Sequence, residues 1–179
     1  MSEYGRVARP EPCVMELVSK LAREPWTDRP TCVHPTLSAA ARAVHDHSSS
    51  AGRRALLPLA PRFIDTARPG LDLSARVVAL CVSTALTTGE LTGDENARLR
   101  KAHETALHLL TGEGAARWWM RFSWSEPFYR TFLATEQVAE SIAVTARHAN
   151  GDRDLKLRQL LKQCLAAHGA LRPGAPTPS

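Results

Sequence analysis

The sequence has no long apolar run and no recognisable export signal. Its longest apolar stretch, residues 77–82, is far shorter than the roughly 20 residues that a membrane-spanning helix needs. The segment MSEYGRVARPEP at the start contains no apolar run of the kind found in a secretory signal. These features predict a protein that is neither membrane-bound nor secreted.

Cysteine is scarce and dispersed. Cys13, Cys32, Cys81 and Cys164 lie far apart in the sequence, and three of them have apolar neighbours in segments with a helical pattern. A free cysteine in such a setting behaves as a small hydrophobic residue. We therefore expect free thiols and a cytoplasmic, reducing environment.

Motifs that specify a reaction or a cofactor are also missing. The glycine spacing is not that of a P-loop or of a dinucleotide-binding fold, and no serine lies in a Gly-x-Ser-x-Gly elbow. No cysteine has an evident base nearby. The sequence thus gives an enzyme no support, and a non-catalytic role is favoured.

The positive charge is spread rather than gathered. The formal net charge is +5, and 19 of the 23 basic residues are arginine, a bias that a GC-rich bacterial genome produces without any binding partner. Nucleic-acid-binding surfaces usually collect their basic residues on one face. Here acidic residues interrupt the arginines, so the charge alone is weak evidence for nucleic-acid binding.

Length and composition predict one domain. A chain of 179 residues with 44% hydrophobic residues can bury a core without metal or disulfide support. We expect a flexible N-terminus over residues 1–10, a single helical domain over 11–170 and a disordered tail over 171–179.

Helical periodicity recurs along the chain, whereas no convincing strand alternation appears. This predicts an all-α fold, an orthogonal or irregular bundle of about seven helices. The expected helices cover residues 12–23, 36–45, 51–65, 73–88, 92–110, 113–122, 126–149 and 152–168.

Three of these segments carry more specific signals. Residues 73–88 contain one charged residue, Arg76, and should form the central helix. Pro58 and Pro61 should kink or divide the helix over residues 51–65. Thr92 and Glu95 have the spacing of a capping box, in which each side chain bonds to the other residue's backbone N–H.

Seven of the ten aromatic residues fall within residues 118–132, interleaved with arginines. Rings at helical spacing beside a helix corner are usually core residues, and this interpretation is favoured. The alternative is a surface that contacts a protein partner or a second copy of the chain. For that surface we select Trp119, Trp124, Tyr129 and Arg121.

A second candidate is a metal site formed by Cys32, His34, His45 and His47. Thiolate and imidazole are ligands that zinc or iron takes. A helix between the two pairs would hold its ends about 15 Å apart, so the connector would have to fold back. Hydrogen-bonding or surface histidines are the favoured interpretation, and a metal-dependent enzyme is the alternative.

A third candidate is an anion site at the start of a helix, formed by Ser49, Ser50, Arg53 and Arg54. Backbone N–H groups and the positive helix end attract a phosphate or an acidic side chain. An ordinary N-cap with solvated arginines is the simpler interpretation. Arg53 and Arg54, with Arg117 and Arg121, are also the residues that a nucleic-acid-binding protein would use.

The leading hypothesis is therefore a non-catalytic cytoplasmic helical protein that contacts another macromolecule as a regulator, an adaptor or its own homodimer. It depends on the missing motifs and on the aromatic segment, and it involves no membrane and no cofactor.

Overall fold

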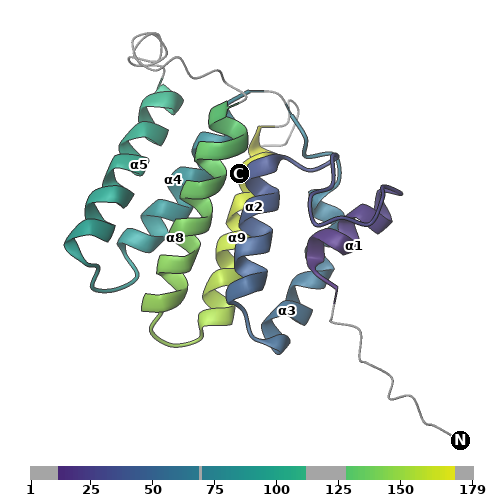
Figure 1. The fold of residues 1–179 in the computed structure, drawn as a ribbon, viewed down its shortest axis with the longest axis horizontal. Coiled ribbons are helices and arrows are strands. Elements are labelled where there is room, and N and C mark those ends of the chain that lie inside the picture. Colours follow the sequence, from purple (N-terminus) through teal and green to yellow (C-terminus); the bar gives the residue numbers. More distant parts are fainter. Residues whose placement is uncertain (1–11, 69, 112–127, 172–179) are drawn as a thin grey trace, which may run out of the picture.

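A computed structural model describes residues 12–68, 70–111 and 128–171, and the described residues form helices joined by loops, without strands (Figure 1). The predicted all-α fold is confirmed. None of the described helices is both long enough and apolar enough to cross a lipid bilayer.

The described part of the chain contains seven α-helices and two helical segments of other types. The α-helices are α1 (Val14–Leu21), α2 (Pro35–His47), α3 (Ser50–Leu56), α4 (Asp72–Leu86), α5 (Gly93–Thr111), α8 (Ala134–His148) and α9 (Arg153–Ala170). The segment η1 (Leu57–Phe63) is a 3₁₀ helix, and η2 (Tyr129–Leu133) is a π-helical turn that leads into α8.

Helix α4 is central, as its apolar sequence predicts. It packs against α2, α5, α8 and α9. Figure 1 shows α5 at one edge of the bundle and α1 and α3 at the opposite edge. Helices α2 and α8 pack against each other along their length, and their contact forms one face of the bundle.

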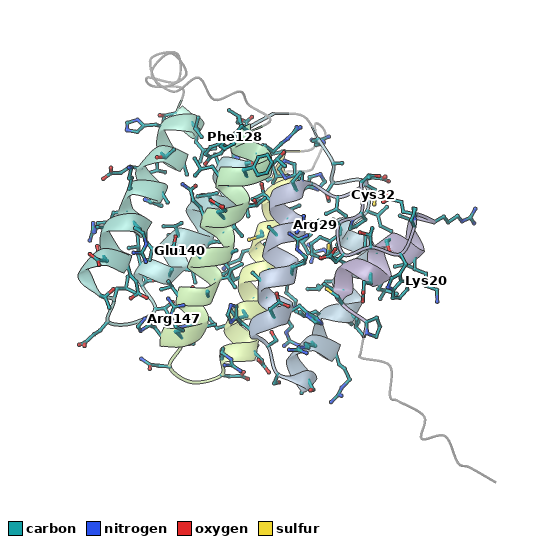
Figure 2. All side chains as sticks on the ribbon, viewed as in Figure 1. Lys20, Arg29, Cys32, Phe128, Glu140 and Arg147 are labelled. Atoms are coloured by element: carbon teal, nitrogen blue, oxygen red, sulfur yellow. The ribbon has the colours of Figure 1, made fainter. Side chains whose placement is uncertain are left out.

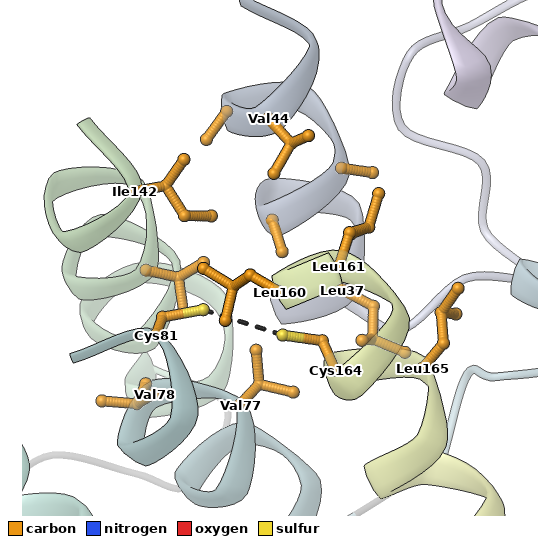
Figure 3. Close-up of a cluster of buried hydrophobic side chains, with 14 of the residues drawn as sticks. Leu37, Val44, Val77, Val78, Cys81, Ile142, Leu160, Leu161, Cys164 and Leu165 are labelled. Atoms are coloured by element: carbon orange, nitrogen blue, oxygen red, sulfur yellow. Dashed lines mark hydrogen bonds between the residues drawn. The ribbon is translucent and has the colours of Figure 1, made fainter. Parts of the chain in front are cut away.

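The core lies where α2, α4, α8 and α9 meet (Figure 3). Its central side chains include Leu37, Val44, Val77, Val78, Ile142, Leu160 and Leu161. Cys81 of α4 and Cys164 of α9 are buried among them with their Sγ atoms 3.7 Å apart. All four cysteines are free thiols, as expected.

Local signals in the sequence act where they were predicted. Helix α3 ends at Leu56, and the chain continues as η1, which contains Pro58 and Pro61. This agrees with the expected division of the segment, because a proline removes a backbone donor.

The capping box of α5 forms as its spacing predicts. The Thr92 N–H donates to Glu95 Oε2 at 3.0 Å, and the Glu95 N–H donates to Thr92 Oγ1 at 3.2 Å. Arg147 of α8 donates to the other carboxylate oxygen of Glu95 at 2.8 Å. One carboxylate therefore both caps α5 and ties it to α8.

The predicted helix over residues 113–122 and the start of the helix expected at Glu126 lie outside the described residues. The described part of that second helix begins differently from expectation, with the π turn η2 before α8. The N–H of Ala134 bonds to the carbonyl of Tyr129, five residues earlier, which widens the first turn.

Candidate anion-binding pocket

The aromatic partner surface is mostly outside the described residues, where Trp119, Trp124 and Arg121 lie. Its remaining member, Tyr129, has no exposed surface, so its assignment to a contact surface is wrong. Burial raises the pKa of the Tyr129 hydroxyl well above its usual value, so the hydroxyl stays protonated. The ring faces inward, and the π turn that carries it packs against α2 and α8.

The predicted metal ligands do not converge. His34 caps the start of α2, where its Nδ1 accepts from the Thr36 N–H at 3.3 Å. His45 and His47 lie at the other end of the same helix. Within the described residues, which include all four predicted ligands, no group of three or more His, Cys, Asp or Glu side chains is placed to hold a metal ion. The connector before α2 does contact the helix, through Asp28 with Ser38 and Arg42, but it does not bring Cys32 to the two later histidines. The metal-site hypothesis is corrected accordingly.

The predicted anion site at the start of α3 holds an acidic side chain of the same chain. Ser49 is the N-cap, and both its N–H and its hydroxyl donate to the carboxylate of Asp154 on α9. These hydrogen bonds lower the pKa of Asp154. Arg53 donates from Nε to the carbonyl of His45 at 3.1 Å. This helix start therefore has an internal anion, which links α3 to α9.

The described residues also line a cavity that the sequence analysis missed. Its volume is about 750 Å³, within the range of ligand pockets. We call it the arginine pocket, and it is lined by Arg29, Pro30, Thr31, Val33, Pro35, Ser38, Arg42, Ala67, Arg68, Arg130, Thr131, Phe132, Thr135 and Glu136. Figure 2 labels Arg29 beside α2 and Phe128 immediately before η2, which leads into the neighbouring α8.

The loop before α2 forms one wall of the pocket, and Glu24 holds it in place. The Glu24 carboxylate accepts from the Thr31 N–H at 2.6 Å, from the Thr31 hydroxyl at 2.9 Å and from the Cys32 N–H at 2.9 Å. Burial acts to raise the pKa of Glu24, but these hydrogen bonds hold that pKa below its usual value. The Ala67 N–H then donates to the Cys32 carbonyl at 3.0 Å, which joins this loop to the next wall.

Backbone carbonyls, not carboxylates, position two of the four arginines. Arg68 Nη1 donates to the Leu171 carbonyl at 2.9 Å, and Arg130 Nη1 donates to the Arg68 carbonyl at 3.3 Å. A carbonyl orients a guanidinium group without neutralising it. Of the four, Arg42 is the one with an acidic partner among the described residues, since Nη1 lies 3.7 Å from Asp28 Oδ2.

The π turn places three consecutive residues, Arg130, Thr131 and Phe132, on the pocket wall. The wider turn of a π helix reduces the rotation between successive side chains, and such turns are frequent at functional sites. Phe132 is 56% exposed at the rim, and its ring centroid lies 5.1 Å from that of Phe128. An arginine and an exposed ring thus share one turn.

A buried polar cluster adjoins the pocket residue Arg130, whose carbonyl accepts from the Thr36 hydroxyl at 3.5 Å. The His34 N–H donates to Thr66 Oγ1 at 3.1 Å, and the Thr36 and Ser74 hydroxyls are 3.0 Å apart. Burial, with the positive charge of Arg130, lowers the pKa of His34 to about 4, so this imidazole is neutral at physiological pH. The cluster therefore adds no positive charge, and the arginines supply the field of the pocket.

The pocket could not be found from sequence spacing, because its arginines come from four separate segments. The closest sequence signal was the interleaving of arginine with aromatic residues, which includes Arg130 and Phe132. Comparison with family models, with curated proteins and with solved structures found no match to this chain.

Proposed function

We propose that this chain is a non-catalytic binding protein whose arginine pocket receives an acidic segment of a partner protein. The observation that carries the proposal is the convergence of four arginines on one cavity that has Glu136 as its one carboxylate among the described lining residues. Guanidinium groups bind carboxylates through paired N–H donors, which favours an acidic ligand.

The composition of the rim supports a protein partner. Arg and aromatic residues are the types that protein interfaces enrich, and they supply most of the binding energy there. Phe132, exposed beside Arg130, offers an apolar contact next to a positive charge. An acidic segment that also carries an apolar side chain would use both features.

The lining residues support binding rather than catalysis. Arginine remains protonated near neutral pH and is a poor general acid or base. The nearby imidazole of His34 is buried with its Nδ1 already accepting a hydrogen bond. The four free thiols agree with a reducing compartment, so the proposal places this binding in the cytoplasm.

Nucleic acid is the less favoured anion. Its backbone needs basic residues along an extended surface, whereas these four arginines face one concave site. Arg53 and Arg54, which the sequence singled out for this role, lie on α3, and neither lines the arginine pocket.

Fluorescence anisotropy with a fluorescein-labelled, glutamate-rich hexapeptide tests the proposal. We expect the full chain to raise the anisotropy saturably, and Arg29→Gln to weaken binding about tenfold through loss of one charge-assisted contact. Arg29 is exposed, so this substitution should leave folding intact.

Arg100→Gln is the matched control. Arg100 is exposed on α5, where its Nε donates to Asn96 at 2.6 Å, and its loss changes the net charge equally. Equal weakening by the two substitutions would mean a general charge effect and would overturn the proposal. Tighter binding of a single-stranded oligonucleotide than of the peptide would also overturn it.

A further inference from the structure

The arginine pocket continues into a second hollow between α2 and α8. We call this hollow the lower groove, and it is lined by Ala39, Arg42, Ala43, Asp46, His47, Thr135, Glu136 and Ala139, with a volume of about 260 Å³. Arg42, Thr135 and Glu136 belong to both walls. The two hollows therefore adjoin, and together they follow the contact between the two helices.

The combined hollow follows the length of α2. The residues of α2 in its lining run from Pro35 to His47, which are the first and last residues of that helix. At 1.5 Å per residue, this helix measures about 18 Å from end to end. An extended chain advances about 3.3 Å per residue, so five or six residues span that length.

Small side chains border the lower groove. Ala39 and Ala43 lie one turn apart on α2, and Ala139 lies opposite on α8. Methyl side chains let a peptide backbone approach both helices closely. A compact small ligand that filled the arginine pocket alone would not need this close approach.

The charge reverses from one end of the hollow to the other. Three of the pocket's arginines, Arg29, Arg68 and Arg130, line the upper end only. Asp46 lines the lower end with its side chain 73% exposed, and its contact there is with His45 Nδ1 at 3.4 Å. A ligand that fits the whole hollow is acidic at one end and basic at the other.

From this juxtaposition we propose that the occupant is an extended protein segment of about six residues, with acidic residues in the arginine pocket and a lysine or arginine beside Asp46. The inference rests on the proposed function, since it names the form and charge pattern of the acidic partner segment. Charge complementarity at both ends fixes the direction in which the segment lies.

Anisotropy competition with blocked hexapeptides tests this proposal. The peptides are Glu-Glu-Ser-Gly-Ser-Lys and its reverse, each acetylated and amidated, with counterparts that carry alanine in place of lysine. In one of the two directions, the lysine peptide should bind about threefold more tightly than its counterpart, the effect of one exposed ion pair.

Asp46→Asn should remove that advantage, whereas Asp94→Asn, at an exposed site in the first turn of α5, should keep it. Arg29→Gln should weaken the binding of all the peptides and should also keep the advantage of the lysine peptide. The inference is overturned if lysine gives no advantage in either direction, if Asp46→Asn leaves the advantage intact, or if blocked Glu-Glu binds as tightly as the hexapeptides. In those cases the proposed function stands, whereas failure of every acidic peptide to bind would overturn both.

Discussion

Replacing Gly52 by alanine should destabilise this protein, although the same change stabilises most helices. Gly52 lies in the first turn of α3, where its N–H donates to Ser49 Oγ at 3.1 Å. A Cβ atom built on Gly52 would lie 2.6 Å from both Cγ and Oδ2 of Asp154. The carboxylate would have to move, and its bonds to the Ser49 N–H and hydroxyl would be lost or stretched.

The magnitude follows from two opposing effects. Alanine in place of glycine gains up to about 1 kcal/mol of helix stability. Hydrogen bonds to a charged group contribute about 1.5 to 3 kcal/mol when shielded, and less at an exposed site such as this one. We therefore expect Gly52→Ala to lower the free energy of unfolding by about 1 kcal/mol.

Removing the carboxylate should reverse the sign of the effect. In an Asp154→Ala background nothing remains for the new methyl group to displace, so Gly52→Ala should be neutral or stabilising by up to about 1 kcal/mol. The double-mutant cycle should then give a coupling energy of about 1 to 2 kcal/mol.

Urea denaturation of the full chain, followed by far-ultraviolet circular dichroism, measures each free energy. Equal effects of Gly52→Ala in the two backgrounds, within about 0.5 kcal/mol, would refute the reasoning. That result would mean that Asp154 does not hold the start of α3.

Three further predictions concern the rim, the core and acid stability. Phe132→Ala should change the unfolding free energy by less than about 1 kcal/mol, because the ring is exposed, yet weaken acidic-peptide binding about tenfold in anisotropy titrations. Ile142→Ala removes a fully buried side chain and should cost about 3 kcal/mol in urea denaturation, whereas a cost below 1 kcal/mol would place Ile142 outside the core. Hydrogen bonds from the Thr92 backbone, then Arg147, lower the pKa of Glu95 from 4.5 to about 2. Its contribution is therefore complete above about pH 4.5 and is lost as the pH falls towards 2, so Glu95→Gln should flatten the acid dependence of the urea midpoint over that range.

Features that depend on neighbouring residues could be predicted from the sequence. The capping box of α5 needs only Thr92 and Glu95, three residues apart, and it forms as expected. The break near Pro58 and Pro61 is equally local. The apolar character of residues 73–88 was enough to identify the central helix, since a helix with few charges must be covered on all sides.

Features that depend on tertiary proximity could not be predicted. The start of α3 does attract an acidic side chain, but the partner, Asp154, lies 105 residues away in the sequence. Arg68 and Arg130 meet only because separate loops and helices bring their backbones together. The π turn that buries Tyr129 and exposes Phe132 breaks regular helical periodicity, which sequence spacing alone does not reveal.

The two carboxylate oxygen atoms of Glu95 join the first turn of α5 to a second helix. Helix termini ordinarily fray independently of the rest of a protein, because their last hydrogen bonds are local. Here the carboxylate that caps the first turn of α5 is also held by Arg147 on α8. Amide protons at the start of α5 should consequently exchange with solvent at rates that follow the motion of α8.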